Sequence, residues 1–259
     1  HNRCRRQRQM CIRDSNDIRS FVSSQVYSWI WNKSCSSFSD MSNVSLEDRS
    51  KFDKEFFINS LDVDVEEESS DGTIKTKFKL HDGNFVEGVL IPKNKRMTAC
   101  ISSQVGCSLS CSFCATGTLG LTRNLSASEI YRQVVYISKK CLEVHNQPLT
   151  NIVFMGMGEP LLNYKNVLRS IHFITSEEGL NMSYKRITLS TSGISKMIRK
   201  LADDNVKVNL ALSLHAANEE LRKKIMPIGK SNTLEEIRDS LKYYLSLIHI
   251  SEPTRHTRL

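Results

Sequence analysis

The sequence has no apolar run near the roughly 20 residues that a membrane-spanning helix needs. It also has no N-terminal apolar stretch followed by a small-residue cleavage site, so a secretory signal is not expected. We therefore expect a cytoplasmic protein that does not enter a membrane. With 259 residues, 39% of them hydrophobic and 25% charged, the chain can bury a substantial core, so disorder is not the default state.

Cysteine is missing from the whole C-terminal part, since none follows Cys141. Three of the eight cysteines are crowded together at Cys107, Cys111 and Cys114. The chain is also much longer than small secreted domains that depend on disulfides. A reduced, metal-binding use of these cysteines is therefore expected.

The net charge of +8 would normally suggest a polyanion as partner, but the charge is unevenly distributed. Residues 1–13 contain five arginines and no acidic residue. This segment and residues 247–259 contain QMCIRDS and SLIHISEPTR, which resemble translated sequencing-adapter DNA, and we expect both to be non-native tails. The alternative is a pair of genuine basic tails that contact RNA.

The N-terminal part is expected to be a small accessory module. Residues 14–60 have apolar side chains at helical spacing, among them Phe21, Val26 and Trp29. Residues 61–96 begin with an acidic stretch, interpreted as a solvated loop, and continue as a β-hairpin around the turn His81-Asp82-Gly83.

Residues 97–246 alternate between strand and helix, which is typical of parallel βα units. Capping-box spacing at Ser126/Glu129 and Thr233/Glu236 predicts two helix starts. The expected strands are Thr98–Ser103, Asn151–Met155, Arg186–Ser190 and Val208–Leu214. The fold class is therefore α/β, and the chemistry of such folds lies at the carboxyl ends of the strands.

The run Cys107-Ser-Leu-Ser-Cys111-Ser-Phe-Cys114 directly follows the first of these strands. Three thiolates can hold three irons of a [4Fe-4S] cluster and leave the fourth iron open for the amino and carboxylate groups of S-adenosylmethionine (SAM). The alternative is a zinc site, which needs four ligands and has Cys100 as its nearest candidate. The spacing and Phe113 favour the cluster.

Three further motifs lie at the carboxyl ends of expected strands. Gly156-Met-Gly158-Glu159-Pro160 allows close backbone approach to a ligand and offers a carboxylate for an ammonium group, although alone it reads as an ordinary turn. Ser190-Thr-Ser-Gly193 and Ser213-Leu-His215 offer hydroxyl and imidazole groups for a ribose or a carboxylate. Taken singly, His215 is more often a structural histidine.

Together these residues resemble the radical SAM adenine-C2 RNA methyltransferases, the RlmN-like family, with Cfr-like adenine-C8 methyltransferases as relatives. The resemblance runs from about Phe21 to about Leu245 and rests on CISSQVGCSLSCSFCATGTLGLTRNLSASEI, FMGMGEPLLN, ITLSTSG and ALSLHAANEELRKKIMPI. WIWNKSCSSFSDMSNVSLEDR is similar to the family's accessory RNA-binding domain. The implied fold is a partial radical SAM (βα)6-type barrel with a helical accessory domain and a β-hairpin.

The resemblance also implies roles for individual residues. It implies that the cluster ligands are Cys107, Cys111 and Cys114, and that SAM is contacted by Gly158, Glu159, Ser190, Ser213, Leu214 and His215. It assigns proton acceptance to Glu87 and resolution of a protein–RNA covalent intermediate to Cys100, and disulfide bonding is a further feature of the family. From the residues alone, Glu87 reads as an exposed strand residue and Cys100 as a small buried hydrophobe.

The implied reaction methylates C2 of adenosine in large-subunit ribosomal RNA and in tRNA. Radical chemistry suits this carbon, because it is too electron-poor for simple polar attack on the methyl group of SAM. One SAM methylates a protein cysteine, and a second SAM yields the radical that takes hydrogen from that methyl. A flavodoxin-like or equivalent electron donor is expected. The alternatives are C8 methylation and a noncatalytic RNA-binding fragment with a structural metal site.

Two parts of the family pattern are not found. Only about four strands are expected between Met97 and Leu245, although a radical SAM barrel usually has six, so one sheet edge should be unpaired. The family's methyl-carrying cysteine lies beyond the matched region, and the upstream Cys4, Cys11 and Cys35 are poor substitutes. We expect a C-terminally truncated fragment.

The first prediction concerns this missing carrier. The chain should bind its cofactors but fail to complete methyl transfer, because no cysteine after Cys141 can receive the methyl group. The measurement is digestion of unmethylated ribosomal RNA fragments after incubation with reconstituted protein, labelled SAM and reductant. Catalytic formation of 2-methyladenosine would show that the expectation about the carrier is wrong.

Overall fold

The computed structural model describes residues 19–248, apart from residues 32, 34, 36, 57, 59, 60 and 178. The tail expected at residues 1–13, most of that expected at 247–259, and the cysteines Cys4 and Cys11 lie outside these described residues. Among the described helices, none is long and apolar enough to cross a membrane.

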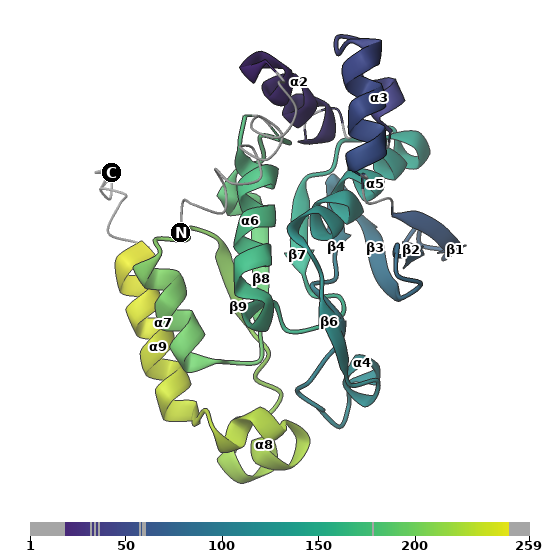
Figure 1. Cartoon of the computed structure of the whole chain (residues 1–259). Helices are drawn as coiled ribbons and strands as arrows, with labels where there is room; N and C mark the ends of the chain where they lie inside the picture. Colours follow the sequence, from purple (N-terminus) through teal and green to yellow (C-terminus); the bar gives the residue numbers. More distant parts are fainter. Residues whose placement is uncertain are drawn as a thin grey trace, which may run out of the picture.

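A mixed seven-stranded sheet forms the centre of the molecule, in the order β1-β2-β3-β4-β7-β8-β9 (Figure 1). Its strands are β1 (Asp62–Glu68), β2 (Ile74–Lys79), β3 (Phe85–Lys93), β4 (Arg96–Cys100), β7 (Asn151–Phe154), β8 (Ile187–Thr191) and β9 (Asn209–Leu212). The first four strands are antiparallel neighbours, and β4, β7, β8 and β9 run parallel. The expected α/β class, hairpin and parallel βα units are confirmed. The strand order ends at β9, so the expected unpaired edge lies there among the described residues.

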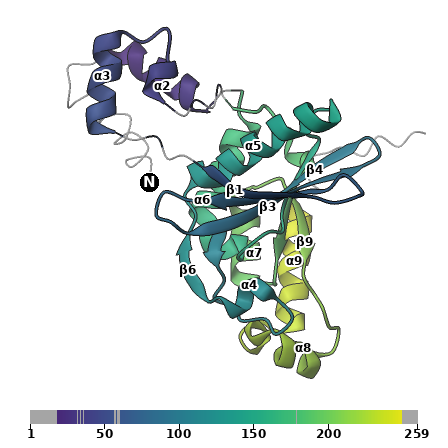
Figure 2. The same ribbon diagram turned by 90° about the vertical axis from the view of Figure 1, so that its right-hand side faces the viewer.

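Helices pack against the parallel half of the sheet (Figures 1 and 2). The long helices are α5 (Ala127–His145), α6 (Tyr164–Thr175), α7 (Ser195–Asp203) and α9 (Leu234–Ile248), and the short ones are α4 (Ala115–Thr118) and α8 (Glu219–Ile225). Single-turn 3-10 helices lie at Pro160–Asn163, Tyr184–Arg186 and Pro227–Lys230. Both predicted capping boxes form, at the start of α5 and ahead of α9. Helices α7 and α9 pack side by side, as do α5 and α6.

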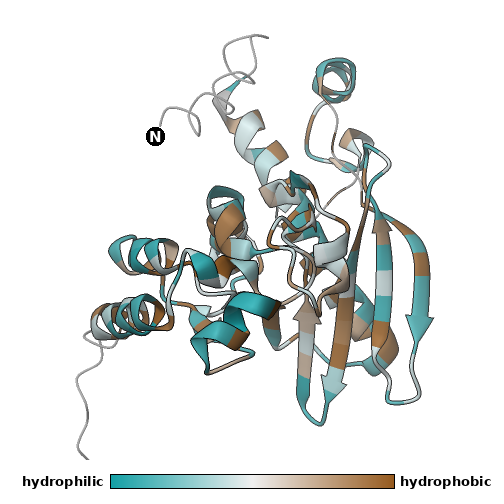
Figure 3. Cartoon of the chain, turned by 90° about the horizontal axis from the view of Figure 1, so that it is seen from below, coloured by the Kyte–Doolittle hydropathy of each residue, from teal (hydrophilic) through white to brown (hydrophobic). Residues whose placement is uncertain are grey.

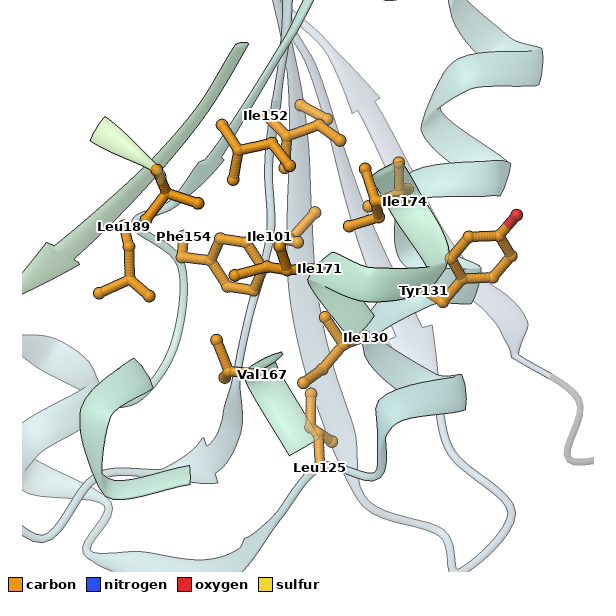
Figure 4. Packing of buried hydrophobic residues seen from close by; sticks show 14 of the residues in the cluster. Ile101, Leu125, Ile130, Tyr131, Ile152, Phe154, Val167, Ile171, Ile174 and Leu189 are labelled. Carbon is orange, nitrogen blue, oxygen red and sulfur yellow. The ribbon is translucent and has the colours of Figure 1, made fainter. Parts of the chain in front are cut away.

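The main core lies between the sheet and helices α5 and α6 (Figure 4). Ile152 and Phe154 of β7 and Leu189 of β8 point from the sheet toward Ile130 of α5 and Ile171 of α6, and all five are buried. The covering helices carry both hydrophobic and hydrophilic residues along their length, as helices with one face on a core do (Figure 3). Burial of this apolar surface is the main stabilising term of the fold.

A second, smaller core belongs to the N-terminal helices α2 (Ser20–Trp31) and α3 (Leu46–Glu55), with a 3-10 turn at Phe38–Asp40 between them. Phe52 and Met41 are among its buried residues. This module is joined to the main core by Trp31, whose ring stacks on Phe173 of α6 at a centroid distance of 3.6 Å. The helical interpretation of this segment is confirmed in its described residues.

The acidic stretch after residue 60 was expected to be a solvated loop, and this expectation is wrong. Its residues 62–68 form β1, which is exposed along its whole length and pairs with β2. Lysines of neighbouring elements balance its charge: Lys77 Nζ lies 2.6 Å from Asp64, and Lys140 Nζ lies 2.8 Å from Glu66. The ladder and these ion pairs offset the repulsion between adjacent carboxylates.

An ion-pair latch holds the tip of the β2–β3 hairpin against the main core. Arg123 Nε lies 2.5 Å from Asp82 at the hairpin turn, and Arg123 Nη2 lies 2.8 Å from the buried carboxylate of Glu129 at the start of α5. The hydrogen bond from Arg123 holds the pKa of Asp82 well below its ordinary value. Burial acts to raise the pKa of Glu129, but hydrogen bonds from Arg123 and Ser126 outweigh it and lower that pKa overall.

This latch gives the second prediction. Since both carboxyl pKa values are lower in the folded state, the latch stabilises the fold above the unfolded pKa values of about 4 and loses this contribution as the pH falls below them. Arg123→Met should reduce the free energy of unfolding at pH 7 by about 2 kcal/mol, between the values typical of exposed and buried pairs. Urea unfolding should show this difference constant above about pH 5 and shrinking as the pH falls from there towards about pH 2.

The matched control is Arg238→Met, because Arg238 forms exposed ion pairs with Glu235 and Asp239 on α9. Its effect on unfolding should be small at every pH. A wild-type advantage over Arg123→Met that stays constant with pH would contradict the latch.

Candidate functional site

A cavity of about 260 Å³ lies at the carboxyl ends of β7, β8 and β9, as expected for parallel βα units. Most of the residues that the sequence motifs predicted for the site line it. These are Cys107, Cys111, Cys114, Gly158, Glu159, Ser190, Ser213 and His215. Segments from four consecutive βα connections therefore meet at one place.

The cysteine loop is carried on a two-stranded ribbon formed by β5 (Gln104–Gly106) and β6 (Leu121–Asn124), which the sequence did not reveal. The loop closes where Cys107 N donates to Gly120 O at 2.8 Å. Gly106 has φ +75°, and a side-chain carbon there would lie 1.8 Å from the Gly120 carbonyl oxygen. Only glycine fits this crossing. On its far side the loop is tied to α8, because Ser112 N donates to Ile225 O at 3.0 Å.

The three thiols of the loop influence one another. Burial raises the pKa of Cys107 and of Cys111, and the charges of neighbouring cysteines and of Glu159 raise both further. In the described part of the chain, no three His, Cys, Asp or Glu side chains are already arranged around a metal ion. The donor set still fits an iron–sulfur cluster, because three thiols face one cavity whose lining includes no fourth cysteine. Cys100 is not part of this lining, which disfavours a four-cysteine zinc site.

Glu159 is a buried carboxylate beside the cysteine loop, with only 4% of its surface exposed. Burial raises its pKa despite hydrogen bonds from the backbone N–H groups of Ser192 (2.8 Å) and Leu161 (3.2 Å). The preceding residue, Gly158, packs closely against Gln104 of β5. It has φ +95°, and a side-chain carbon there would lie 2.5 Å from Gln104. This glycine lets the carboxylate reach the cavity.

The hydroxyl groups of Ser190 and Ser213 lie 3.2 Å apart at the ends of β8 and β9. His215 takes the left-handed conformation with φ +55°, and its ring lies 4.1 Å from that of Phe113, centroid to centroid. Phe113 was singled out by the sequence only as part of the cysteine motif. Leu214 lies outside the cavity and borders a separate apolar groove between β9 and α9.

Glu87 and Cys100 are not in the cavity lining, but the strand register relates them to it. Cys100 aligns through β7 with Thr188, two residues before Ser190, and it pairs on its other side with Val89, two residues after Glu87. Because side chains alternate between faces, Glu87, Cys100 and Ser190 project from the same face of the sheet. That face is opposite the one packed on α5 and α6.

The immediate surroundings of these two residues differ. Glu87 is half exposed, and its Oε1 lies 2.8 Å from Lys75 Nζ. Burial raises the pKa of Cys100. All six described cysteines are free, so the disulfide implied by the resemblance is not present among the residues that the structure describes.

Three residues of the site had no distinct role in the sequence motifs. Ser192 and Met226 line the cavity, and Arg222 is fully buried behind it with its guanidinium on the Ser192 carbonyl. The Ser190–Gly193 run pointed to the first of them. Arg222 gave no signal, because it lies in the short charged segment EELRKKI, which reads as a solvated helix.

The N-terminal module lies at the opposite end of the sheet from this cavity. In both ribbon views α2 and α3 are at the top, while α4 and α8, which flank the cysteine loop, are at the bottom (Figures 1 and 2). The module therefore does not line the cavity.

Comparison with known families agrees with the site. The radical SAM superfamily profile matches residues 101–251, and the ribosomal RNA large subunit methyltransferase N-terminal domain matches residues 12–58. A crystal structure of a radical SAM methyltransferase from Sphaerobacter thermophilus superimposes with a TM-score of 0.84 at 36% identity. That superposition covers 91% of this chain and 69% of the other.

The similar curated proteins are named as dual-specificity RNA methyltransferases RlmN, in several cases with the qualifier probable. The Flavobacterium johnsoniae protein is 55% identical over 89% of this chain and 66% of its own length. The Cytophaga hutchinsonii protein is 57% identical over 87% of this chain and 62% of its own length, and the Bacillus subtilis protein is 39% identical over 89% and 63%. The chain thus spans just under two thirds of these relatives.

The third prediction concerns Cys111. Cys111→Ala should lose the cluster, because two thiolates are too few to hold it. The measurement is iron and sulfide content with the visible absorbance after anaerobic reconstitution. Cys141→Ser is the matched control, since Cys141 is buried in α5, where its Sγ contacts the Gln147 carbonyl oxygen at 3.1 Å. It should load iron normally. Normal iron content in Cys111→Ala, or a colourless protein with tightly held zinc, would contradict the assignment.

Proposed function

The chain belongs to the radical SAM superfamily and, within it, to the RlmN-like family, and from this premise we propose that it serves adenosine-C2 methylation of large-subunit ribosomal RNA and tRNA through a methyl-cysteine intermediate. The observation that carries the proposal is the meeting of three thiols, a buried carboxylate and two strand-end hydroxyls in one cavity. The whole activity is proposed, because the chain spans only part of its relatives.

The proposed cofactors are a [4Fe-4S] cluster and SAM. Cys107, Cys111 and Cys114 would hold the cluster, and the buried carboxylate of Glu159 would accept hydrogen bonds from the SAM amino group. The proposed SAM contacts also include Gly158, Ser190, Ser213, Leu214 and His215. When bound, the two cofactors supply one-electron chemistry that side chains alone cannot provide.

Glu87 and Cys100 are proposed to act when the methylated RNA is released. Both project from the sheet face that carries Ser190, and Glu87 remains accessible beside Lys75. Glu87 would accept a proton from the adenine. The Cys100 thiolate would attack the sulfur of the methyl-carrying cysteine, so that a disulfide forms as the carbon–sulfur bond to the RNA breaks. Burial raises the pKa of Cys100, so this thiol must lose its proton before it attacks.

The proposed partners are large-subunit ribosomal RNA, tRNA and a flavodoxin-like or equivalent electron donor, and the proposed location is the cytoplasm. The proposed RNA-binding accessory domain comprises residues 14–60, followed by the linker and hairpin of residues 61–96 and the radical SAM core of residues 97–246. The match of residues 12–58 to a methyltransferase N-terminal domain supports RNA as the substrate class.

The fourth prediction tests this function. The reconstituted chain should convert SAM to 5'-deoxyadenosine when a reductant is added, and Cys107→Ala should abolish this cleavage. Glu87→Gln and Cys100→Ala should keep at least half of the cleavage rate, because their roles follow radical formation. The measurement is chromatography of the nucleoside products.

Three outcomes would contradict the proposal. Absence of 5'-deoxyadenosine would favour a noncatalytic module, and loss of cleavage in both release variants would remove their assigned roles. RNA incubated in the same reaction is analysed by mass spectrometry, and if it becomes methylated, the methyl group should be on C2 of adenine. A methyl group on C8 would overturn the ring position and favour a Cfr-like activity.

A further inference from the structure

We propose that Ser192, held in place by Arg222, is a further SAM-binding residue, whose hydroxyl group contacts the carboxylate of the methionine part. The inference rests on the proposed function, since it requires SAM in the cavity. It concerns the amino-acid end of the cofactor. Glu159 is proposed to bind the nitrogen of this end, but no protein donor has yet been assigned to its carboxylate.

Ser192 has a buried polar atom that the fold does not satisfy. The residue is 6% exposed and lines the cavity together with Cys111 and Glu159. The Ser192 hydroxyl is close enough to Glu159 to lower the pKa of that carboxyl group, against the larger effect of burial. Within the described part of the chain, however, no group lies at a distance and angle suitable for a hydrogen bond with this hydroxyl. A buried hydroxyl without a partner costs free energy, and such an atom beside a cavity indicates a missing ligand.

The backbone of Ser192 is held from both sides, so its hydroxyl has a defined position. Its N–H donates to Glu159 Oε2 at 2.8 Å, and its carbonyl accepts from Arg222 Nη2. Arg222 is 1% exposed and also reaches the Asn232 carbonyl at 3.4 Å. Its Nε is buried without a hydrogen-bond partner among the described residues, and Glu219 is the neighbouring acidic group whose charge acts on it most strongly.

The resulting arrangement matches the charges of an amino acid. On one side of Ser192 lies the carboxylate of Glu159, and on the other lies the guanidinium of Arg222, close enough to Cys111 for their charges to interact. The methionine part of SAM carries an amino group and a carboxylate, and each needs a hydrogen-bond partner when it is buried. Glu159 suits the amino group. The Ser192 hydroxyl, with the positive charge of Arg222 behind it, suits the carboxylate.

The fifth prediction compares two ligands. SAM and decarboxylated SAM differ by the carboxylate, so a residue that contacts this group should matter for only one of them. Ser192→Ala should weaken equilibrium binding of SAM to the cluster-loaded chain about tenfold, the value expected for one hydrogen bond to a charged group. Binding of decarboxylated SAM should be unchanged. Ser170→Ala is the matched control, because Ser170 is equally buried but donates within its own helix to the Val167 carbonyl at 2.8 Å.

The role of Arg222 is tested with one variant that keeps its positive charge and one that removes it. Arg222→Lys should retain most of the SAM affinity, whereas Arg222→Met should weaken SAM more than decarboxylated SAM. Iron content and thermal melting, measured on each variant, show whether the chain is folded and loaded. If Arg222→Met does not fold, the ligand comparison in Ser192→Ala and Arg222→Lys decides the matter.

The possible failures are distinct. If the unmodified, cluster-loaded chain binds neither ligand, the proposed function fails. If that chain binds SAM but Ser192→Ala weakens both ligands equally, or neither, the inference about the carboxylate is overturned. Loss of iron in Ser192→Ala would also overturn it, since the residue would then act on the cysteine loop.

Discussion

The geometry of the site depends on the hydrogen bonds made by one buried residue, Glu159. The backbone N–H of Glu159 donates to the side-chain oxygen of Gln104 at 2.8 Å, and its carboxylate oxygens accept from the backbone N–H groups of Leu161 and Ser192. Gln104 in turn donates to Asn124 at 2.7 Å across the β5–β6 ribbon. A buried charge tolerates few arrangements, because each lost hydrogen bond leaves it less compensated. Through its backbone N–H and its carboxylate together, Glu159 therefore links the ribbon that carries the cysteine loop, the end of β7 and the end of β8.

The parts of the fold that the sequence predicted are those with local causes. The capping boxes at Ser126 and Thr233 place their own hydrogen bonds within four residues, and the turn at His81-Asp82-Gly83 needs only its glycine conformation. The cysteine spacing is equally local. The meeting of Gly158, Ser190 and Ser213 followed from one non-local rule, that parallel strands end at the same edge of a sheet.

The parts that escaped prediction depend on partners distant in sequence. Asp64 and Glu66 form a strand because Lys77 and Lys140 lie beside them, and no local pattern shows this. The ribbon of β5 and β6 joins segments separated by the cysteine loop itself. Arg222 is buried only because α8 packs against the loop and the end of β8, and a charged residue in a polar segment otherwise reads as solvated. Tertiary packing overrides composition at all three places.

The ribbon that carries the cysteine loop also determines which part of the site can open. It is only three to four residues long on each side, and beyond it the loop is held mainly by the contact of Ser112 with Ile225. Strand β5 of the ribbon is buried and is held to the end of β7 by the hydrogen bond between Glu159 and Gln104, whereas Cys111 and Cys114 in the loop beyond it are only partly buried. The tip of the loop is therefore the part of the site that can open at the lowest free energy, while the ribbon, the seven-stranded sheet and their shared core stay folded.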